Sequence, residues 1–596
     1  MDPLTTDAST RTLLSRWRAI SANPAGLRPL RIGITASYTI EPVLPALGCF
    51  LADRGLLATF VVAPFNQIYQ SLVDPRSALR EAPLDLTIIL ARIEDLCGPS
   101  LRELSTLAPA SIEAARAASR TEIVRLSAAV ARYAQTSASP VVCANFAMTA
   151  STPLGVLDAS HESSVSRLRS ELNVLLWQSL ASTSVVTLDV ESAVSQFGAT
   201  HAYDDRMWHV SRHPYSTSFG KHLAYWICRT ITPLFVAPAK VIVLDLDNTL
   251  WGGVIGEDGI GGIALGDSGL GSAYVAFQEA LLACRNQGVL LCVASKNNER
   301  DAFEVFDKHS AMRIRREHLS AFRINWNRKS DSITALSREL NVGIDSMVFI
   351  DDSPTECEEV RHVHPQVTVV QAPADPALAV AMLRAIPALD RVMLTSEDRA
   401  RAEQYRVEHE RKAAEPSADA DPKELGAYLQ SLELKVSVRR PTSDERARVA
   451  QLTQKTNQFN LTTIRRTEPE IDALLSDPAW RVFVLTASDR FGDYGLVGAC
   501  IVHTSERVAI DTFLLSCRIL GRGVETAFLA TVLRDLSTVG SDVVHATLIE
   551  TTKNAPVREF LPSHGFSLTP DGSWVRPISP EALGTPHIAI MNESAT

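Results

Sequence analysis

Short apolar runs alternate with longer amphipathic stretches along most of the chain. Runs of strand length occur at residues 30–35, 58–62, 86–90 and 141–143, and again at residues 240–244, 289–294, 346–350 and 367–370. Between two of them, residues 274–285 place apolar side chains at helical spacing, and Gly288 is positioned to end that helix. Strands that alternate with helices in this way predict α/β domains with doubly wound parallel sheets.

The last third of the chain has a different pattern. A helix is followed by β-like runs, a glycine-rich turn, a second helix and a further strand, which predicts a mixed α/β domain. The β-like runs are residues 481–485, 498–503, 508–515 and 542–549. A proline-bracketed stretch near residue 236 and a charge-rich stretch near residue 395 divide the chain. The predicted domains are residues 1–235, 236–390 and 426–596, with a helical linker at residues 391–425.

Composition narrows the class of protein. The 596 residues carry 58 basic and 68 acidic side chains, a formal charge of −10, so a dedicated binder of nucleic acid or of anionic membranes is not expected. No run approaches the roughly 18 apolar residues of a membrane span, and no secretory signal is visible. The nine cysteines form no C-x-x-C pair. We therefore expect a cytoplasmic protein with reduced thiols.

The sharpest chemical motif follows the apolar run at residues 241–244. Asp245 and Asp247 form a D-x-D-x-T sequence with Thr249, at the carboxyl end of a predicted parallel strand, where α/β sheets bind ligands. Alternate strand residues point the same way, so we expect the two carboxylates to share one Mg²⁺. One carboxylate then attacks phosphorus while the other exchanges protons with the leaving group and water. Alone, D-x-D is a weak signal.

Three later features strengthen it, each at the end of a strand or the start of a helix. Ser295 ends a strand, where its hydroxyl is able to bond a phosphoryl oxygen. Lys329 precedes a helix and is able to neutralise phosphate charge. Asp351 and Asp352 follow another strand and add carboxylates for the metal. The order D-x-D, Ser, Lys, Asp-Asp predicts a phosphoryl-transfer site.

This order resembles the haloacid-dehalogenase (HAD) phosphatase superfamily over residues 240–385. The resemblance implies that Asp245 is a nucleophile that becomes an aspartyl-phosphate and that Asp247 is the acid/base. It also implies that Ser295 and Lys329 hold the phosphoryl group, and that Asp351 or Asp352 completes the Mg²⁺ site. The short insertion after the first motif implies a capless, Rossmann-like HAD domain with an open site. A catalytically inert HAD scaffold is the alternative.

The third region carries a glycine turn with a cysteine beside it. Its sequence, Ser516-Cys-Arg-Ile-Leu-Gly-Arg-Gly523, contains an R-x-x-G-x-G core that resembles the pyrophosphate-binding turn of GNAT acyltransferases. Asn554 opens a segment that resembles the GNAT ending. The resemblance implies ligand contacts from Arg518, Gly521, Gly523 and Asn554. Cys517 beside arginines and a helix start is a candidate thiolate nucleophile, and a buried packing cysteine is the alternative.

A polar block at residues 451–463 has two readings. It contains Asn457, Gln458 and Asn460 around one aromatic side chain. It is either a helix end that passes into an Asn/Thr-rich turn or a surface that contacts a pantetheine arm or a glyceryl group. His503 and His545 are interpreted as ordinary strand histidines.

The order of these domains resembles the FkbH-like proteins, glyceryl transferase/phosphatases of polyketide biosynthesis. The motifs are Leu244-Asp-Leu-Asp-Asn-Thr-Leu-Trp-Gly-Gly253, Phe349-Ile-Asp-Asp-Ser-Pro354, Thr453-Gln-Lys-Thr-Asn-Gln-Phe-Asn460 and Ser516-Cys-Arg-Ile-Leu-Gly-Arg522. The resemblance covers residues 240–566. It implies Mg²⁺-dependent dephosphorylation of 1,3-bisphosphoglycerate and transfer of its glyceryl unit to an acyl carrier protein as a thioester.

The first domain resembles the SGNH-hydrolase-like domain of longer members of this group. It lacks the G-D-S motif, and Ser37 stands after the first strand instead. The D-x-x-H spacing is also absent near His209. We expect a scaffold or a carrier-protein docking domain, with Ser37 and His209 as a minority catalytic alternative.

Two other functions stay open for the whole chain. One is a plain HAD phosphatase of a small phosphomonoester whose GNAT-like domain acylates an amine from acyl-CoA. The other is a docking protein whose HAD domain is inert.

Overall fold

The computed structural model describes residues 10–24, 26–104, 108–147, 152–394, 422–505, 507–551, 554–570, 572–578, 583–585 and 587–591. The chain divides into two compact units, Met1–Val236 with Thr467–Ala473, and Ala237–Arg466 with Leu474–Thr596. Most of the predicted helical linker, residues 395–421, lies outside the described residues. A search of the described helices finds none that combines the length and the apolarity needed to cross a membrane.

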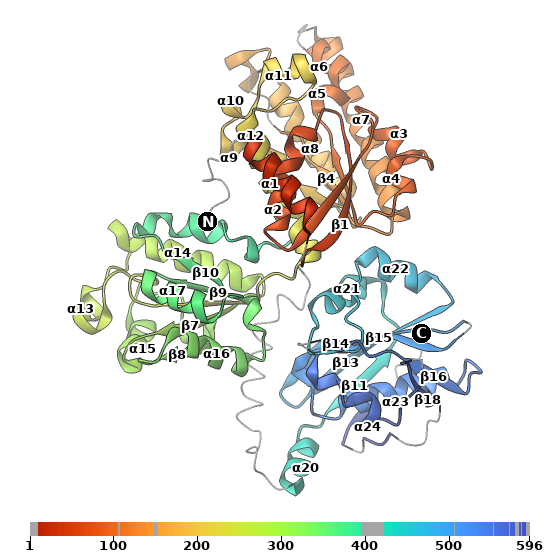
Figure 1. Cartoon of the computed structure of the whole chain (residues 1–596). Helices are drawn as coiled ribbons and strands as arrows, with labels where there is room; N and C mark the ends of the chain where they lie inside the picture. The colour runs from red at the N-terminus through yellow and green to blue at the C-terminus, as the bar shows by residue number, and fades with distance from the viewer. Residues whose placement is uncertain are drawn as a thin grey trace. The chain divides into compact units, whose positions relative to one another are not determined.

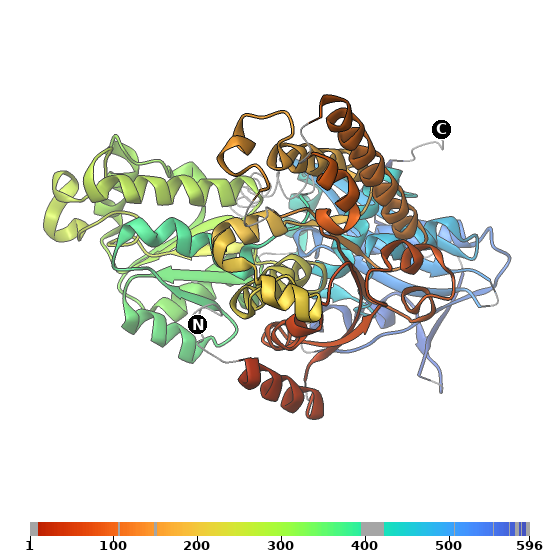
Figure 2. The same ribbon diagram turned by 90° about the horizontal axis from the view of Figure 1, so that it is seen from above.

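The first unit is built on a five-stranded parallel sheet in the order β2-β1-β3-β4-β5. Its strands are β1 (Arg28–Ala36), β2 (Leu56–Val62), β3 (Leu86–Leu90), β4 (Val141–Ala144) and β5 (Val186–Leu188). Strand residues contribute to two separate apolar cores, one with helices α2 and α12 and one with α7 and α8. Figures 1 and 2 show these helices, in red to yellow, around the strands. The predicted doubly wound sheet is therefore present.

The helices of the first unit vary widely in length. They are α1 (Thr10–Ala22), α2 (Leu44–Ala52), α3 (Ile68–Val73), α4 (Ala78–Glu81), α5 (Ile93–Leu96), α6 (Gly98–Leu104), α7 (Pro109–Thr136), α8 (Val165–Leu180), α9 (Val190–Phe197), α10 (Ala199–Ala202), α11 (Asp205–Ser211) and α12 (Thr217–Phe235).

The second unit begins with another five-stranded parallel sheet, in the order β10-β9-β6-β7-β8. Its elements are β6 (Val241–Leu244), α13 (Ile255–Gly262), α14 (Gly269–Asn286), β7 (Leu290–Ser295), α15 (Glu299–Lys308), β8 (Leu319–Ile324), α16 (Lys329–Leu340), β9 (Met347–Asp351), α17 (Pro354–Val363), β10 (Thr368–Gln371) and α18 (Ala379–Arg384). No further domain is inserted between β6 and β7, where the described residues form only α13 and α14.

Strand β6 shows how the apolar runs build this domain. Val241 and Val243 enter the core that contains Leu336 of α16, whereas Ile242 and Leu244 enter the core that contains Phe277 of α14. Successive side chains point to opposite faces of a strand, so a strand covered on both faces reads as a continuous apolar run. This arrangement places every carboxyl-terminal strand end at one edge of the sheet.

The rest of the second unit is built around a mixed, mostly antiparallel sheet in the order β17-β18-β16-β15-β14-β13-β11-β19, with β12 paired to β15. Its elements are α20 (Pro422–Ser431), β11 (Lys435–Arg439), α21 (Arg446–Lys455), β12 (Phe459–Asn460), β13 (Trp480–Asp489), β14 (Gly492–His503), β15 (Ala509–Leu515), α23 (Val524–Leu536), β16 (Val543–Ala546), α24 (Phe560–Ser563), β17 (Ser567–Leu568), β18 (Trp574–Pro577) and β19 (Ala589–Met591). Most of α22 (Glu468–Ser476) belongs to the first unit. One apolar core joins α23 to this sheet.

Candidate active site

The centre of the candidate site is a pair of aspartates on neighbouring strands. Asp245 follows β6 directly, and Asp351 is the last residue of β9. The two strands are parallel, with Leu244 opposite Ile350, and the Asp245 amide donates to the Ile350 carbonyl at 3.0 Å. The register therefore brings both carboxylates to the same edge of the sheet, side by side.

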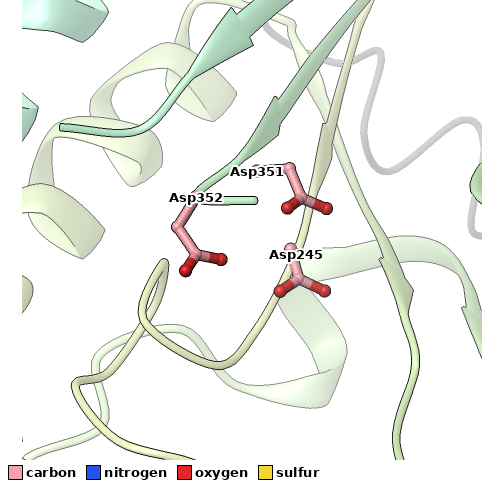
Figure 3. A group of neighbouring side chains, drawn as sticks. All are labelled: Asp245, Asp351 and Asp352. Atoms are coloured by element: carbon pink, nitrogen blue, oxygen red, sulfur yellow. The ribbon is translucent and has the colours of Figure 1, made fainter. Parts of the chain in front are cut away.

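Three carboxylates gather at this edge. Asp245, Asp351 and Asp352 each offer an oxygen, and these oxygens lie within 4.8 Å of one another. Figure 3 shows the three carboxyl groups close together, two of them at the end of β9. Asp245 and Asp351 are buried and Asp352 is partly exposed, so the group is closed on its inner side and reachable from Asp352.

Lys329 lies against this group. It is the first residue of α16, and 3% of its side chain is exposed. Its ammonium contacts the Asp245 carboxylate, forms an ion pair with Asp351 Oδ2 at 3.0 Å and donates to the Ala294 carbonyl at 2.7 Å. The predicted convergence of Asp245, Lys329 and Asp351 in one place is what the structure shows.

Burial and crowding of like charges perturb these groups. Burial, then the negative charge of Asp245, raises the pKa of Asp351 to about 6 even though Lys329 opposes the change. The same two causes raise the pKa of Asp352. Burial acts to lower the pKa of Lys329, but the charges of Asp245 and Asp351 outweigh it and raise that pKa. The site thus holds more negative charge than its lysine balances.

The residue types present fit a Mg²⁺ ion. Carboxylate oxygens are the hard ligands that Mg²⁺ prefers, and it binds through one or two of them while it keeps several waters. Asp351 Oδ2 has the Lys329 ammonium as a partner, whereas Thr249 Oγ1, on the turn that follows Asp245, is buried with no hydrogen-bond partner among the described residues. A buried hydroxyl without a partner, close in the chain to this excess negative charge, is what a water bound to a cation would satisfy.

Asp247 does not join the three carboxylates. Its Oδ1 accepts hydrogen bonds from the Trp251 indole at 2.9 Å and from the Ile255 amide at 3.1 Å. Its Oδ2 accepts one from Asn297 Nδ2 at 2.9 Å. The expectation that Asp245 and Asp247 share the metal through alternate strand positions is therefore corrected. Strand β6 ends at Leu244, so the two-residue alternation no longer applies at Asp247.

The backbone after Asp247 turns sharply. Asn248 adopts a left-handed conformation, with φ of 52°, and its Oδ1 accepts from the Gly253 amide at 2.9 Å. Asparagine tolerates this conformation better than most residues. The turn brings Trp251 back beside Asp247.

Ser295 lies at the same strand edge as Asp245, and Thr249 lies on the turn that follows β6. Ser295 ends β7, next to β6, and its Oγ accepts from Asn297 Nδ2 at 3.3 Å. Both hydroxyl-bearing side chains are buried. Sequence reasoning missed Asn297 and Trp251. Two features of the sequence could have pointed to them: the polar run that follows Ser295, and a tryptophan four residues after Asp247.

The ligand residues expected in the third domain are used differently. Asn554 is fully buried; its Nδ2 donates to the carbonyls of Asn460 and Ile549, at 3.1 and 2.9 Å, and its Oδ1 accepts from the Thr551 amide. The Asn460 side chain bonds Thr456, Thr462 and Thr463 main-chain groups. These two amides serve the interior, which corrects their expected contact with pantetheine.

Another side chain of the polar block is also bonded within the protein. Arg465 donates to Asn457 Oδ1, while Gln458 is partly exposed. The physical reason is β12, which pairs antiparallel with β15 and sets Asn460 opposite Leu514. The block therefore begins with the end of α21 at Lys455, as the first interpretation predicted, and continues into the buried two-residue strand β12 where a turn was expected.

The glycine turn before α23 has the backbone expected of it. Gly521 and Gly523 have φ of 76° and 78°, and Gly523 caps α23. Arg518 donates to Ser516 Oγ at 3.3 Å. Cys517 begins a short 3₁₀ turn, Cys517–Ile519, and α23 begins only at Val524.

This placement changes the argument for a thiolate at Cys517. The helix start expected beside it is only that short 3₁₀ turn, which carries little of an α-helix dipole. The Arg522 guanidinium donates to the Tyr494 hydroxyl at 2.6 Å and to the Arg518 carbonyl at 2.8 Å. Arg522 is thus engaged in the interior. The nucleophilic role of Cys517 stays a prediction.

In the first unit, Ser37 and His209 are not joined. Ser37 Oγ donates to Asp95 at 2.7 Å and accepts from the Arg92 amide at 3.0 Å. His209 is exposed on α11, and the hydrogen bonds of the described residues contain none between it and Ser37. The minority catalytic alternative is therefore not arranged as a dyad.

Comparison with solved structures gives a similarity that covers about two thirds of the chain. The N-terminal part of BF1531 from Bacteroides fragilis, which contains a phosphatase domain complexed with Mg, covers 65% of this chain and 100% of its own, with 26% identity and a TM-score of 0.57. No protein family profile matches the chain. No curated protein matches it either.

Acetyltransferases match a smaller part. The ribosomal-protein-S18-alanine N-acetyltransferase of Escherichia coli covers 24% of this chain and 94% of its own, with 14% identity and a TM-score of 0.20. A GNAT-family acetyltransferase of Staphylococcus aureus Mu50 covers 24% and 99%, with 10% identity and a TM-score of 0.19.

Proposed function

We propose that the central domain is a Mg²⁺-dependent phosphatase that uses Asp245 as its nucleophile. The observation that carries the proposal is the contact of the buried Lys329 ammonium with both Asp245 and Asp351 at the carboxyl edge of a parallel sheet. The chain is an enzyme and takes Mg²⁺; both predictions are confirmed by the likeness to the magnesium-bound phosphatase domain of BF1531.

The residues divide the chemistry among them. Asp245 with Asp351 or Asp352 would hold Mg²⁺, which supplies charge stabilisation for the transferred phosphoryl group. An Asp245 oxygen attacks phosphorus, the bond to the leaving oxygen breaks, and Asp247 gives that oxygen a proton. Asp247 then takes a proton from the water that hydrolyses the aspartyl-phosphate. Lys329 and Ser295 hold the phosphoryl oxygens.

For the whole chain, the proposed reaction is glyceryl transfer from 1,3-bisphosphoglycerate to an acyl carrier protein, as in the FkbH-like proteins that the motifs resemble. The C1 acyl phosphate is already activated, so the Cys517 thiolate displaces phosphate and holds the acyl group as a thioester. The carrier's phosphopantetheine thiol then takes that group by exchange. The C3 phosphate is an unactivated monoester and requires the Asp245 site.

Intact-mass analysis of a holo carrier protein after incubation with 1,3-bisphosphoglycerate tests this reaction. The wild type should leave a glyceryl adduct, Asp245→Asn a phosphoglyceryl adduct, and Cys517→Ala no adduct. Normal loading by Cys517→Ala would remove Cys517 from the scheme. No thioester with any variant would favour the plain phosphatase with an acyl-CoA-dependent domain. A lack of Mg²⁺-dependent hydrolysis of an aryl phosphate would favour the docking protein.

A further inference from the structure

The carboxylate of Asp247 is held by three donors from three places in the chain. The Trp251 indole and the Ile255 amide both donate to Oδ1, and Asn297 donates to Oδ2. Both side-chain donors are buried, Trp251 completely. An arrangement of this kind fixes the rotation of a carboxylate.

The chemistry of the donors distinguishes the two oxygens. An indole N–H and a peptide N–H only donate, so Oδ1 is occupied by two groups that are unable to accept a proton from it. Oδ2 accepts from a single donor among the described residues, the Asn297 amide, so it keeps room for a further hydrogen-bond partner. Oδ2 is therefore the oxygen of Asp247 that is left able to exchange a proton.

The two side-chain donors are themselves anchored. The Trp251 ring packs edge-on against Phe306, with centroids 5.9 Å apart. Asn297 Nδ2 also reaches Ser295 Oγ at 3.3 Å, which ties Asp247 to the serine at the end of β7.

We propose that Trp251 and Asn297 are positioning residues that fix the orientation of the Asp247 carboxylate and direct its Oδ2 to proton exchange. The proposal rests on the proposed phosphatase function. In the first half-reaction, Asp245 forms a bond to phosphorus, the bond to the leaving oxygen breaks, and the proton on Asp247 Oδ2 passes to that oxygen. A leaving group that is stable as an anion departs at nearly the same rate without this proton. A leaving group that would depart as an alkoxide is released much more slowly without it.

The test compares two substrates in single turnover, with the rate of leaving-group release as the readout. The phenol of 4-nitrophenyl phosphate leaves as a stable anion, and the hydroxyl of 3-phosphoglycerate leaves as an alkoxide. We expect Trp251→Phe and Asn297→Leu to slow release from 3-phosphoglycerate by about tenfold, and release from 4-nitrophenyl phosphate by less than about threefold. Calorimetric Mg²⁺ affinity should stay within about threefold of wild type.

The matched control is the same pair of substitutions in an Asp247→Asn background, where neither should slow release from 3-phosphoglycerate further. Equal slowing on both substrates, additivity with Asp247→Asn, or a large change in Mg²⁺ affinity would each overturn the positioning role. A Mg²⁺-dependent thermal shift equal to that of wild type reports that each variant is folded. Wild-type protein that releases neither leaving group would instead refute the proposed function itself.

Discussion

The substitution Lys329→Met removes the cation that contacts both Asp245 and Asp351 while it keeps an unbranched side chain of similar length. Asp351 is 1% exposed and the Lys329 side chain 3% exposed, so water replaces little of the lost interaction. Removal of one partner from a buried ion pair costs about 3–5 kcal/mol. For a domain of this size, about 1 kcal/mol moves the melting temperature by about 2–4 °C.

We therefore expect the central domain of Lys329→Met to melt about 10 °C or more below wild type when EDTA is present. Added Mg²⁺ should raise the melting temperature of the variant more than that of wild type, because the divalent cation compensates the carboxylates that lost their lysine. Differential scanning calorimetry with and without Mg²⁺ measures both shifts.

Lys308→Met is the matched control. Lys308 pairs with Glu304 on the exposed surface of α15, so the same change of residue type should scarcely move the melting temperature. If Lys329→Met melted with wild type in EDTA, or gained no more than wild type from Mg²⁺, the electrostatic account of the site would be refuted.

Two further predictions concern other buried polar groups. The pKa of Asp351 is raised in the folded chain, so the folded chain keeps a proton that the unfolded chain releases. This proton stabilises the folded state at low pH, and the stabilisation is lost as the pH rises through about 6. Between pH 5 and 7.5 in EDTA, wild type should lose roughly 1.4 kcal/mol relative to Asp351→Asn in urea titrations, and parallel curves would contradict this. Asn554→Leu leaves the carbonyls of Asn460 and Ile549 without their amide donor, so we expect a loss of about 2–3 kcal/mol confined to the C-terminal domain. Amide hydrogen exchange measured separately for each domain would detect this loss. If protection of the amides fell equally in all domains, the prediction would be contradicted.

The sequence predicted the central sheet because its signals are local. A strand buried on both faces must be apolar throughout, and functional side chains must follow such strands at the carboxyl edge. This reasoning predicted that Lys329 lies near Asp245, although the two residues are far apart in the sequence. It failed for Asp247, whose direction depends on where β6 ends and on a left-handed Asn248, and neither is visible in an apolar pattern.

Weak or short strands escaped prediction. β5, β8 and β11 are absent from the predicted set. In β8, Phe322 is exposed and only two positions are buried, so its sequence lacks the continuous apolar signal of its neighbours. In the third domain, β12 consists of two residues inside an Asn/Thr-rich block, and its strand character comes from pairing with β15. Pairing between distant segments leaves little trace in local composition.

The register of β6 and β9 also bears on how the central sheet assembles. A slip of two residues would keep every apolar side chain on its own face and would move Asp245 and Asp351 about 7 Å apart. Repulsion between the two carboxylates is therefore stronger in the native alignment than in the slipped one. The Lys329 ammonium offsets this repulsion, because it contacts both acids in the native alignment. The first residue of α16 therefore stabilises the pairing of two strands in its own sheet.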